Sequence, residues 1–270
     1  MQIARIREVL IRLFVLINAG CLSTSAGAHD FWMQASTYYP QPGERVNISL
    51  HVGVDLVGDS LPNIPDWYQD FSYFDGEARH KVKGDTGDDP AGYFNAGKRG
   101  TQVVGYHSKP EFVELKPAKF DAYLKEEGLE KIISRRRKLN ESNSNAREYY
   151  IRCVKMLVQT GESAEGYDQT LDYTLELFPQ QNPYELKVGD RLPIKLRYKN
   201  RPLKDALVIA FSRQQPQIKQ KIRTNSEGLA IVELNNAGEW IIKAVEMERY
   251  QKEDAEWISY WSSLTFELKQ

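Results

Sequence analysis

The sequence has little cysteine and no excess of charge of either sign. Its 270 residues include two cysteines, and 36 Lys and Arg nearly balance 37 Asp and Glu. Cys21 lies in the N-terminal segment that we expect to be removed, so Cys153 alone remains and the mature chain has no internal disulfide. Without a basic stripe to displace phosphate counterions, nucleic acid is excluded as the expected partner.

Catalytic signatures are absent as well. The chain has no GxSxG motif, no glycine-rich phosphate loop and no cysteine with a base beside it. We therefore expect that the protein is not an enzyme. Cys153 has two interpretations, a small buried hydrophobic residue or a nucleophile or ligand, and the first is favoured because free cysteines are usually buried. Trp257 and Trp261 are predicted as core or edge aromatics of a β-sheet rather than a sugar platform.

The first 28 residues are typical of a secretory signal peptide. Three arginines precede an apolar run over residues 13–17, and Ala26-Gly27-Ala28 is a small-x-small cleavage site. The run is shorter than the about 20 residues that span a bilayer. The alternative is a lipoprotein box ending at Cys21, but Asn18 stands where an aliphatic residue is expected. We predict a soluble periplasmic protein that begins at His29, and its formal net charge changes from −1 to −3 on cleavage.

The rest of the chain predicts a mainly β fold, with two tandem immunoglobulin-like β-sandwiches over residues 29–116 and 171–270. A helical insert is expected between them at 117–161. The segments 42–50 and 188–196 share a turn followed by alternating apolar residues, and Gly100 and Gly238 each begin a later strand, which indicates a repeat.

Individual elements follow from periodicity and turn residues. Strands are expected at 44–54, 72–75, 100–107, 111–115, 171–178, 191–198, 205–212, 218–223, 229–234, 239–247 and 259–267. Residues 55–97 are expected to be mostly loops because they are rich in Gly, Pro and Asp. Gly128 should divide two short helices, and Tyr150, Cys153, Val154 and Leu157 have helical spacing, which predicts a third.

Several motifs together resemble a periplasmic domain family of unknown function that is labelled as nickel- or cobalt-uptake-like. They are His29-Asp30-Phe31-Trp32, Gly105-Tyr106 with Ser108-Lys109-Pro110, residues 119–129, Arg201-Pro202-Leu203, Gly238-Glu239-Trp240 and Trp257 with residues 261–267. The resemblance implies a periplasmic component of a cobalt or nickel transport system. The chain departs from it at Glu246, where family members tend to carry His.

A metal site at the mature N-terminus is the sharpest functional hypothesis. As first residue, His29 would offer an α-amine and an imidazole to Ni²⁺, Co²⁺ or Cu²⁺. Two nitrogens need a further ligand, for which His51, His107 and Asp30 are the candidates. Phe31 and Trp32 should anchor this end, although His51 also reads as an unpaired histidine on the polar face of a strand.

Two functions therefore remain open. The first is a non-enzymatic metal-handling or binding component of an uptake system, with a membrane transport protein as partner. The second is a structural or adaptor module of the cell envelope that binds a protein partner and no metal.

We predict that metal affinity depends on the free amine of His29. Because an α-amine titrates near 8 and an imidazole near 6.5, affinity should fall steeply on acidification through that range. Calorimetric titration with Ni²⁺, Co²⁺ and Cu²⁺ would compare the protein beginning at His29, verified by mass spectrometry, with a form that keeps one residue before it. Equal affinity in both forms, or binding in neither, would contradict the prediction.

Overall fold

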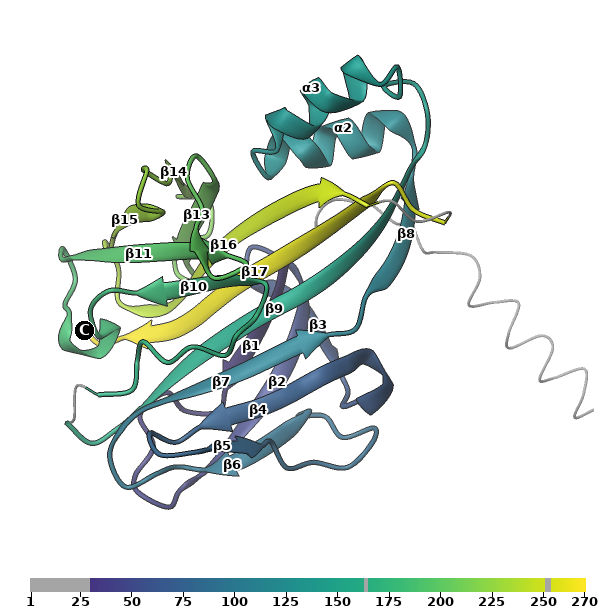
Figure 1. Cartoon of the computed structure of the whole chain (residues 1–270). Helices are drawn as coiled ribbons and strands as arrows, with labels where there is room; N and C mark the ends of the chain where they lie inside the picture. Colours follow the sequence, from purple (N-terminus) through teal and green to yellow (C-terminus); the bar gives the residue numbers. More distant parts are fainter. Residues whose placement is uncertain (1–29, 163–164, 251–253) are drawn as a thin grey trace, which may run out of the picture.

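The computed structural model of this protein describes residues 30–162, 165–250 and 254–270. These residues form three β-sheets and two α-helices, which confirms the predicted mainly β fold. The largest sheet has nine strands in the order β14-β13-β16-β17-β9-β7-β4-β5, with β8 paired to β9 (Figure 1). Within the described ranges, no helix is both long and apolar enough to cross a bilayer.

The three sheets are a nine-stranded sheet, an N-terminal sheet and a C-terminal sheet. The nine-stranded sheet contains β4 (Tyr68–Phe74), β5 (Arg79–Lys81), β7 (Gly100–Ser108), β8 (Glu111–Leu115), β9 (Ala146–Thr160), β13 (Leu207–Ser212), β14 (Gln220–Arg223), β16 (Gly238–Arg249) and β17 (Trp257–Leu268). The N-terminal sheet contains β1 (Asp30–Ala35), β2 (Arg45–Val54), β3 (Val57–Leu61) and β6 (Gly92–Asn95). The C-terminal sheet contains β10 (Leu175–Pro179), β11 (Arg191–Tyr198), β12 (Arg201–Pro202) and β15 (Leu229–Glu233). The helices are α2 (Pro117–Glu126) and α3 (Glu130–Lys138), with short 3-10 turns η1 (Pro65–Trp67) and η2 (Pro183–Glu185).

The two halves of the chain pair their strands in the same way. In the N-terminal sheet β2 pairs with β1, β3 and β6, and in the C-terminal sheet β11 pairs with β10, β12 and β15. In the nine-stranded sheet β4 pairs with β5 and β7, just as β13 pairs with β14 and β16. The repeat predicted from segments 42–50 and 188–196 therefore falls on equivalent strands, β2 and β11.

The halves are joined through one pair of strands. β17 runs parallel to β9, with Trp257 opposite Glu148 and Thr265 opposite Met156. The N-terminal and C-terminal sheets pack against opposite faces of the nine-stranded sheet, which runs between them in Figure 1. Both halves therefore share a single sheet.

β9 is buried on both faces, which explains an error in the sequence interpretation. Val154 and Met156 pack with the N-terminal sheet, whereas Cys153 and Leu157 pack with the C-terminal sheet. A strand covered on both sides is apolar at nearly every position, so its period of two is hidden. The predicted helix containing Cys153 is therefore wrong, and the helical part of the predicted insert 117–161 ends at Lys138.

The prediction of mostly loops over residues 55–97 is only partly right. The strand expected at 72–75 overlaps β4, but this stretch also contains β3, η1, β5 and β6. Positions 57–60 of β3 and all three residues of β5 are exposed, so these short edge strands have no apolar face that alternation could reveal. Other predicted strands are confirmed: 111–115 and 191–198 match β8 and β11 residue for residue.

The helices belong to an insert in the first half. β8, α2 and α3 lie in the connection between β7 and β9, while the equivalent connection between β16 and β17 is a few residues long. Apolar side chains of both helices pack against Val245, Met247 and Trp257 of the opposite half. Gly128 separates the helices as predicted, with φ of +68°, and a Cβ there would lie 2.6 Å from Leu207 Cβ.

We predict that the protein unfolds in one transition because β9 belongs to both cores. Leu157→Ala and Met156→Ala each remove a fully buried side chain from a different core and should each destabilise the protein by about 2–5 kcal/mol. Differential scanning calorimetry should show both variants lowering the same transition. The exposed Lys221→Ala should leave it within about 0.5 kcal/mol. Two transitions, each lowered by one variant only, would contradict the shared sheet.

Candidate functional site

The structure does not bring the predicted histidine ligands together. His51 on β2 stacks on Trp32, with ring centroids 5.2 Å apart, and His107 on β7 stacks on Tyr173 at 4.7 Å. The two imidazoles thus belong to different sheets, and burial lowers the pKa of each. His29 lies outside the described residues.

Asp30, the remaining candidate ligand, is held by a cation. Its Oδ1 lies 2.5 Å from the ammonium nitrogen of Lys243, which competes directly with a metal ion. Across the described ranges 30–162, 165–250 and 254–270, no group of three His, Cys, Asp or Glu side chains is placed to hold a metal. The sequence hypothesis therefore depends on His29.

A pocket of about 360 Å³ lies between the insert and strands β9, β16 and β17 of the nine-stranded sheet. β8 contributes Val113 and Leu115, α2 contributes Tyr123, and β1 contributes Asp30 and Phe31. Its floor consists of side chains from β9, β16 and β17, on the sheet face that also carries β1. We call this cavity the insert pocket, because the insert supplies one whole wall.

Glu148 on β9 is the buried carboxyl of the insert pocket, with 1% of its surface exposed. Its Oε1 accepts hydrogen bonds from the Tyr123 hydroxyl at 3.1 Å and from the Ser259 hydroxyl. The Trp261 indole N–H donates to Ser259 Oγ at 2.8 Å, so the serine hydrogen stays directed at Glu148. Oε2 has no hydrogen-bond partner among the described residues. Burial raises the pKa of this carboxyl to about 7, despite the two hydrogen bonds.

A second charged group borders the pocket. Lys243 on β16 lies 2.5 Å from Asp30 Oδ1 and 3.0 Å from Glu127 Oε1, and all three side chains are buried. Burial acts to lower the pKa of Lys243, but the two carboxylates outweigh it and raise that pKa well above its ordinary value. The ammonium is therefore charged at neutral pH and is held by both carboxylates.

Arg152 is the other cation of the pocket, and it too is already paired. Its guanidinium forms an ion pair with Glu111 of β8. It also lies 4.8 Å from the ring centroid of Phe31 and 4.9 Å from that of Tyr150. Arg152 thus ties β8 and β1 to β9 and keeps the pocket walls in place.

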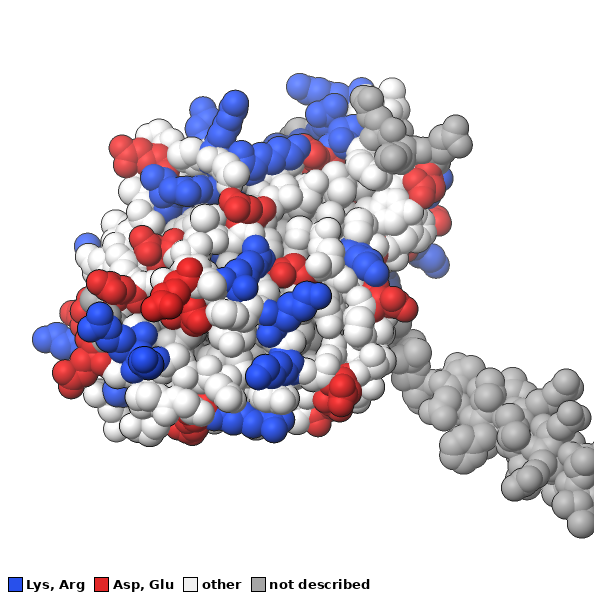
Figure 2. Space-filling model, turned by 60° about the horizontal axis from the view of Figure 1, so that its bottom comes forward, with Lys and Arg blue, Asp and Glu red and all other residues white. Residues whose placement is uncertain are grey.

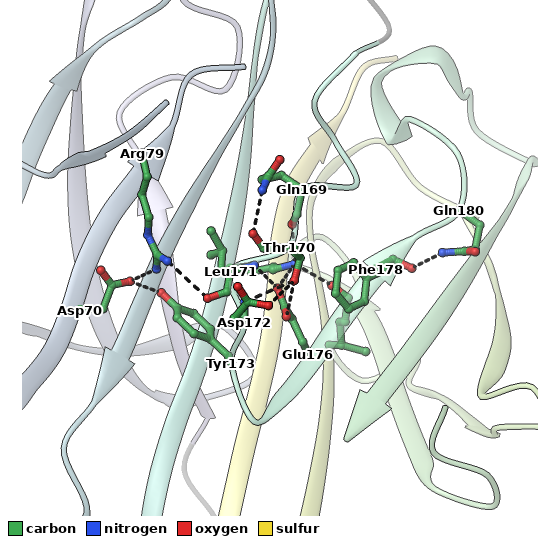
Figure 3. Close-up of polar contacts among 12 residues, drawn as sticks. Asp70, Arg79, Gln169, Thr170, Leu171, Asp172, Tyr173, Glu176, Phe178 and Gln180 are labelled. Atoms are coloured by element: carbon green, nitrogen blue, oxygen red, sulfur yellow. Dashed lines mark hydrogen bonds and ion pairs between the residues drawn. The ribbon is translucent and has the colours of Figure 1, made fainter. Parts of the chain in front are cut away.

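A contrasting polar cluster fastens the chain where it crosses between the halves (Figure 3). Glu176 is also buried, but its Oε1 lies 2.5 Å from Lys155 Nζ and accepts the Leu171 N–H at 2.7 Å. Its Oε2 accepts from the Thr170 hydroxyl at 3.3 Å. Both oxygens of Glu176 therefore have partners, as expected of a structural ion pair.

The same cluster continues toward β4. Arg79 and the Tyr173 hydroxyl each donate to Asp70 Oδ2 at 2.5 Å, as the dashed lines in Figure 3 show. Because Arg79 is paired with Asp70 and Lys155 with Glu176, these ion pairs hold the segment before β10 in place. Glu148 differs from this cluster in keeping one oxygen unpaired.

The chain belongs to the family described as a domain of unknown function, DUF4198, which it matches over residues 26–248. No curated protein matches it. The family's description assigns no activity, and nothing in these comparisons links the chain to nickel or cobalt uptake.

Three of the six motifs that carried the sequence resemblance meet at the insert pocket. Asp30 and Phe31 follow His29, Tyr123 and Glu127 belong to segment 119–129, and Trp261 begins the last motif; four of these line the cavity and Glu127 binds its lysine. Sequence reasoning missed Glu148 because it lies in the stretch mistaken for helix. It also missed Trp261 as a pocket residue, because the sequence around a single tryptophan does not show which face of the sheet the side chain occupies.

We predict that Glu148→Gln stabilises the protein more at pH 8 than at pH 5. A carboxyl whose pKa is raised on folding, here from 4.5 to about 7, binds more protons in the folded state, so stability falls as pH rises between these values. The variant cannot ionise and avoids this loss, which amounts to about 2–3 kcal/mol across that pH range. Urea unfolding at both pH values would measure the difference. A gain independent of pH would contradict a raised pKa.

Proposed function

We propose that this protein is a non-enzymatic binding protein of the periplasm, which holds a small molecule in the insert pocket. The observation that carries the proposal is Glu148, a buried carboxyl that lines the cavity and whose Oε2 has no partner among the described residues. An unsatisfied buried acceptor destabilises a protein by about 1–3 kcal/mol, and more when it is charged. Such a group is retained where a ligand supplies the missing donor.

The origin of the pocket supports a functional role. The strand pairing of the two halves is the same, and the first half differs by the insert that contains β8, α2 and α3. That insert provides Val113, Leu115 and Tyr123 to the cavity. Because the insert is absent from the second half and forms a wall of the pocket, ligand binding explains its presence better than a contribution to stability does. We also propose that each half of the chain derives from an immunoglobulin-like sandwich.

The side chains around the pocket favour binding over chemistry. Ser259, whose hydroxyl donates to Glu148, is fully buried and does not line the pocket, so it is not placed to attack a molecule there. Burial raises the pKa of Tyr123 well above its ordinary value, so its hydroxyl stays protonated. The thiol of Cys153 is buried, and burial raises its pKa to about 12, so it is not a nucleophile at neutral pH. Its interpretation as a core residue is confirmed.

The charges and exposed apolar residues of the outer surface favour a small molecule as the ligand over a polyanion or a large protein. Lys and Arg are interspersed with Asp and Glu on the face in Figure 2. Exposed large hydrophobic residues, such as Val57, Trp67, Phe112 and Ile218, lie on different elements and form no stripe along one strand or helix. We propose that the loaded protein delivers its ligand to a membrane uptake system, with an envelope adaptor role as the alternative.

Metal handling through His29 is a second proposal. It is favoured by Asp30, the one further ligand candidate that lies at the insert pocket and next to His29 in the sequence. Binding of Ni²⁺, Co²⁺ or Cu²⁺ there would have to displace Lys243 from Asp30. The comparison of free and extended N-termini described above separates this proposal from the first.

We predict that filling the insert pocket abolishes binding of an apolar probe. Val113→Trp places a large ring in the cavity from β8, whereas Phe112→Trp changes the neighbouring side chain, which is 49% exposed on the other face of that strand. Fluorescence titration with the neutral dye N-phenyl-1-naphthylamine should show saturable binding to the wild type and to Phe112→Trp. Val113→Trp should bind at least about tenfold more weakly. Equal binding by all three proteins would overturn the proposed function.

A further inference from the structure

We propose that the ligand of the insert pocket is an organic cation, an amine attached to an apolar or aromatic body, whose ammonium group donates to Glu148 Oε2. This inference rests on the proposed function and names the class of molecule that the pocket takes.

The charges around the pocket sum to a negative value. Lys243 is shared by two carboxylates, Asp30 and Glu127, so that group carries one surplus negative charge when both acids are ionised. Arg152 and Glu111 cancel each other. Glu148 has no cationic partner among the described residues, and its ionised form adds a second negative charge. A cation entering the pocket would therefore relieve this imbalance, whereas an anion would increase it.

The walls select a cation with an apolar body. Val113, Leu115 and Val245 give one side of the cavity an aliphatic surface. Trp261 and Tyr123 stack with ring centroids 5.3 Å apart, and both line the pocket. Arg152 already covers the rings of Phe31 and Tyr150. The rings of Trp261 and Tyr123 are therefore the aromatic surface of the pocket that remains for a cation or a flat ring of the ligand.

The free acceptor fixes where the positive charge belongs. Oε1 of Glu148 is used by Tyr123 and Ser259, while Oε2 is buried and has no partner among the described residues, so a donor that reaches it breaks no existing hydrogen bond. An ammonium N–H at this oxygen would form a charge-assisted hydrogen bond in a dry site. A bare metal ion fits less well, because the described residues include no group of three His, Cys, Asp or Glu side chains placed to hold one, and the cations Lys243 and Arg152 line the pocket.

The test uses one pair of ligands that differ only in charge. 1-Naphthylmethylamine is a cation at pH 8, and 1-naphthalenemethanol is its neutral counterpart of the same size. Their dissociation constants would be measured for the wild type, for Glu148→Gln, and for Glu239→Gln. Glu239 is a buried carboxylate of the same sheet that is paired to Arg213 and does not line the pocket. 1-Naphthoate serves as the anionic comparison, and circular dichroism verifies folding.

The wild type and Glu239→Gln should bind the amine at least about tenfold more tightly than the alcohol, and bind the naphthoate most weakly. Glu148→Gln should lose most of this preference for the amine, because only the surplus charge of the Lys243 group remains. If the alcohol binds as tightly as the amine in the wild type, or the preference in Glu148→Gln is as large as in the wild type, the cation inference is overturned while the pocket remains a binding site. If neither compound nor the neutral naphthylamine dye binds, both the inference and the proposed function fail.

Discussion

Burial of β9 on both faces is the constraint on which the rest of the structure depends. Alternate side chains of this one strand enter two different cores, and its edge pairs in parallel with β17 of the second half. A strand in that position cannot be removed without exposing apolar surface on both sides of the sheet. We therefore expect the two halves to unfold as one cooperative unit, although their strand pairing is that of a repeat.

The same arrangement creates the pocket. Because β9 and β17 lie side by side, polar residues from two halves of the chain, Glu148 and Ser259, become neighbours on one face of the sheet. β1 covers only part of that face, and the insert covers another part with Tyr123 and β8. The cavity is the space left between these two covers, so its position is fixed by rigid strands and only one wall belongs to the added helices.

The sequence predicted the elements whose apolar residues alternate or recur on one face. β11 and β8 match their predicted bounds, and Gly128 marks the helix boundary, because one side of each element faces water. The prediction of a helix at β9 is wrong because burial on both faces hides the alternation of apolar residues. For the same reason the sequence did not indicate that Glu148, which lies on β9, is a site residue. The meeting of Asp30, Tyr123 and Trp261 could not be predicted from local patterns, since it requires the parallel pairing of β9 and β17. Only the motifs of the family resemblance pointed to those positions.

The comparison of two buried glutamates carries the functional argument. Glu148 lies on β9, whereas Glu176 lies on β10 of the C-terminal sheet and pairs with Lys155 of β9, and both glutamates are 1% exposed. Burial of a carboxylate is tolerated at Glu176 because Lys155 and two further donors satisfy both oxygens. Glu148 receives donors at one oxygen only and has no cation beside it, so its ionised form is poorly solvated. Stability alone would favour a neutral or apolar residue at position 148. A carboxyl there is consistent with a charge that is completed from outside the chain, by a ligand in the insert pocket.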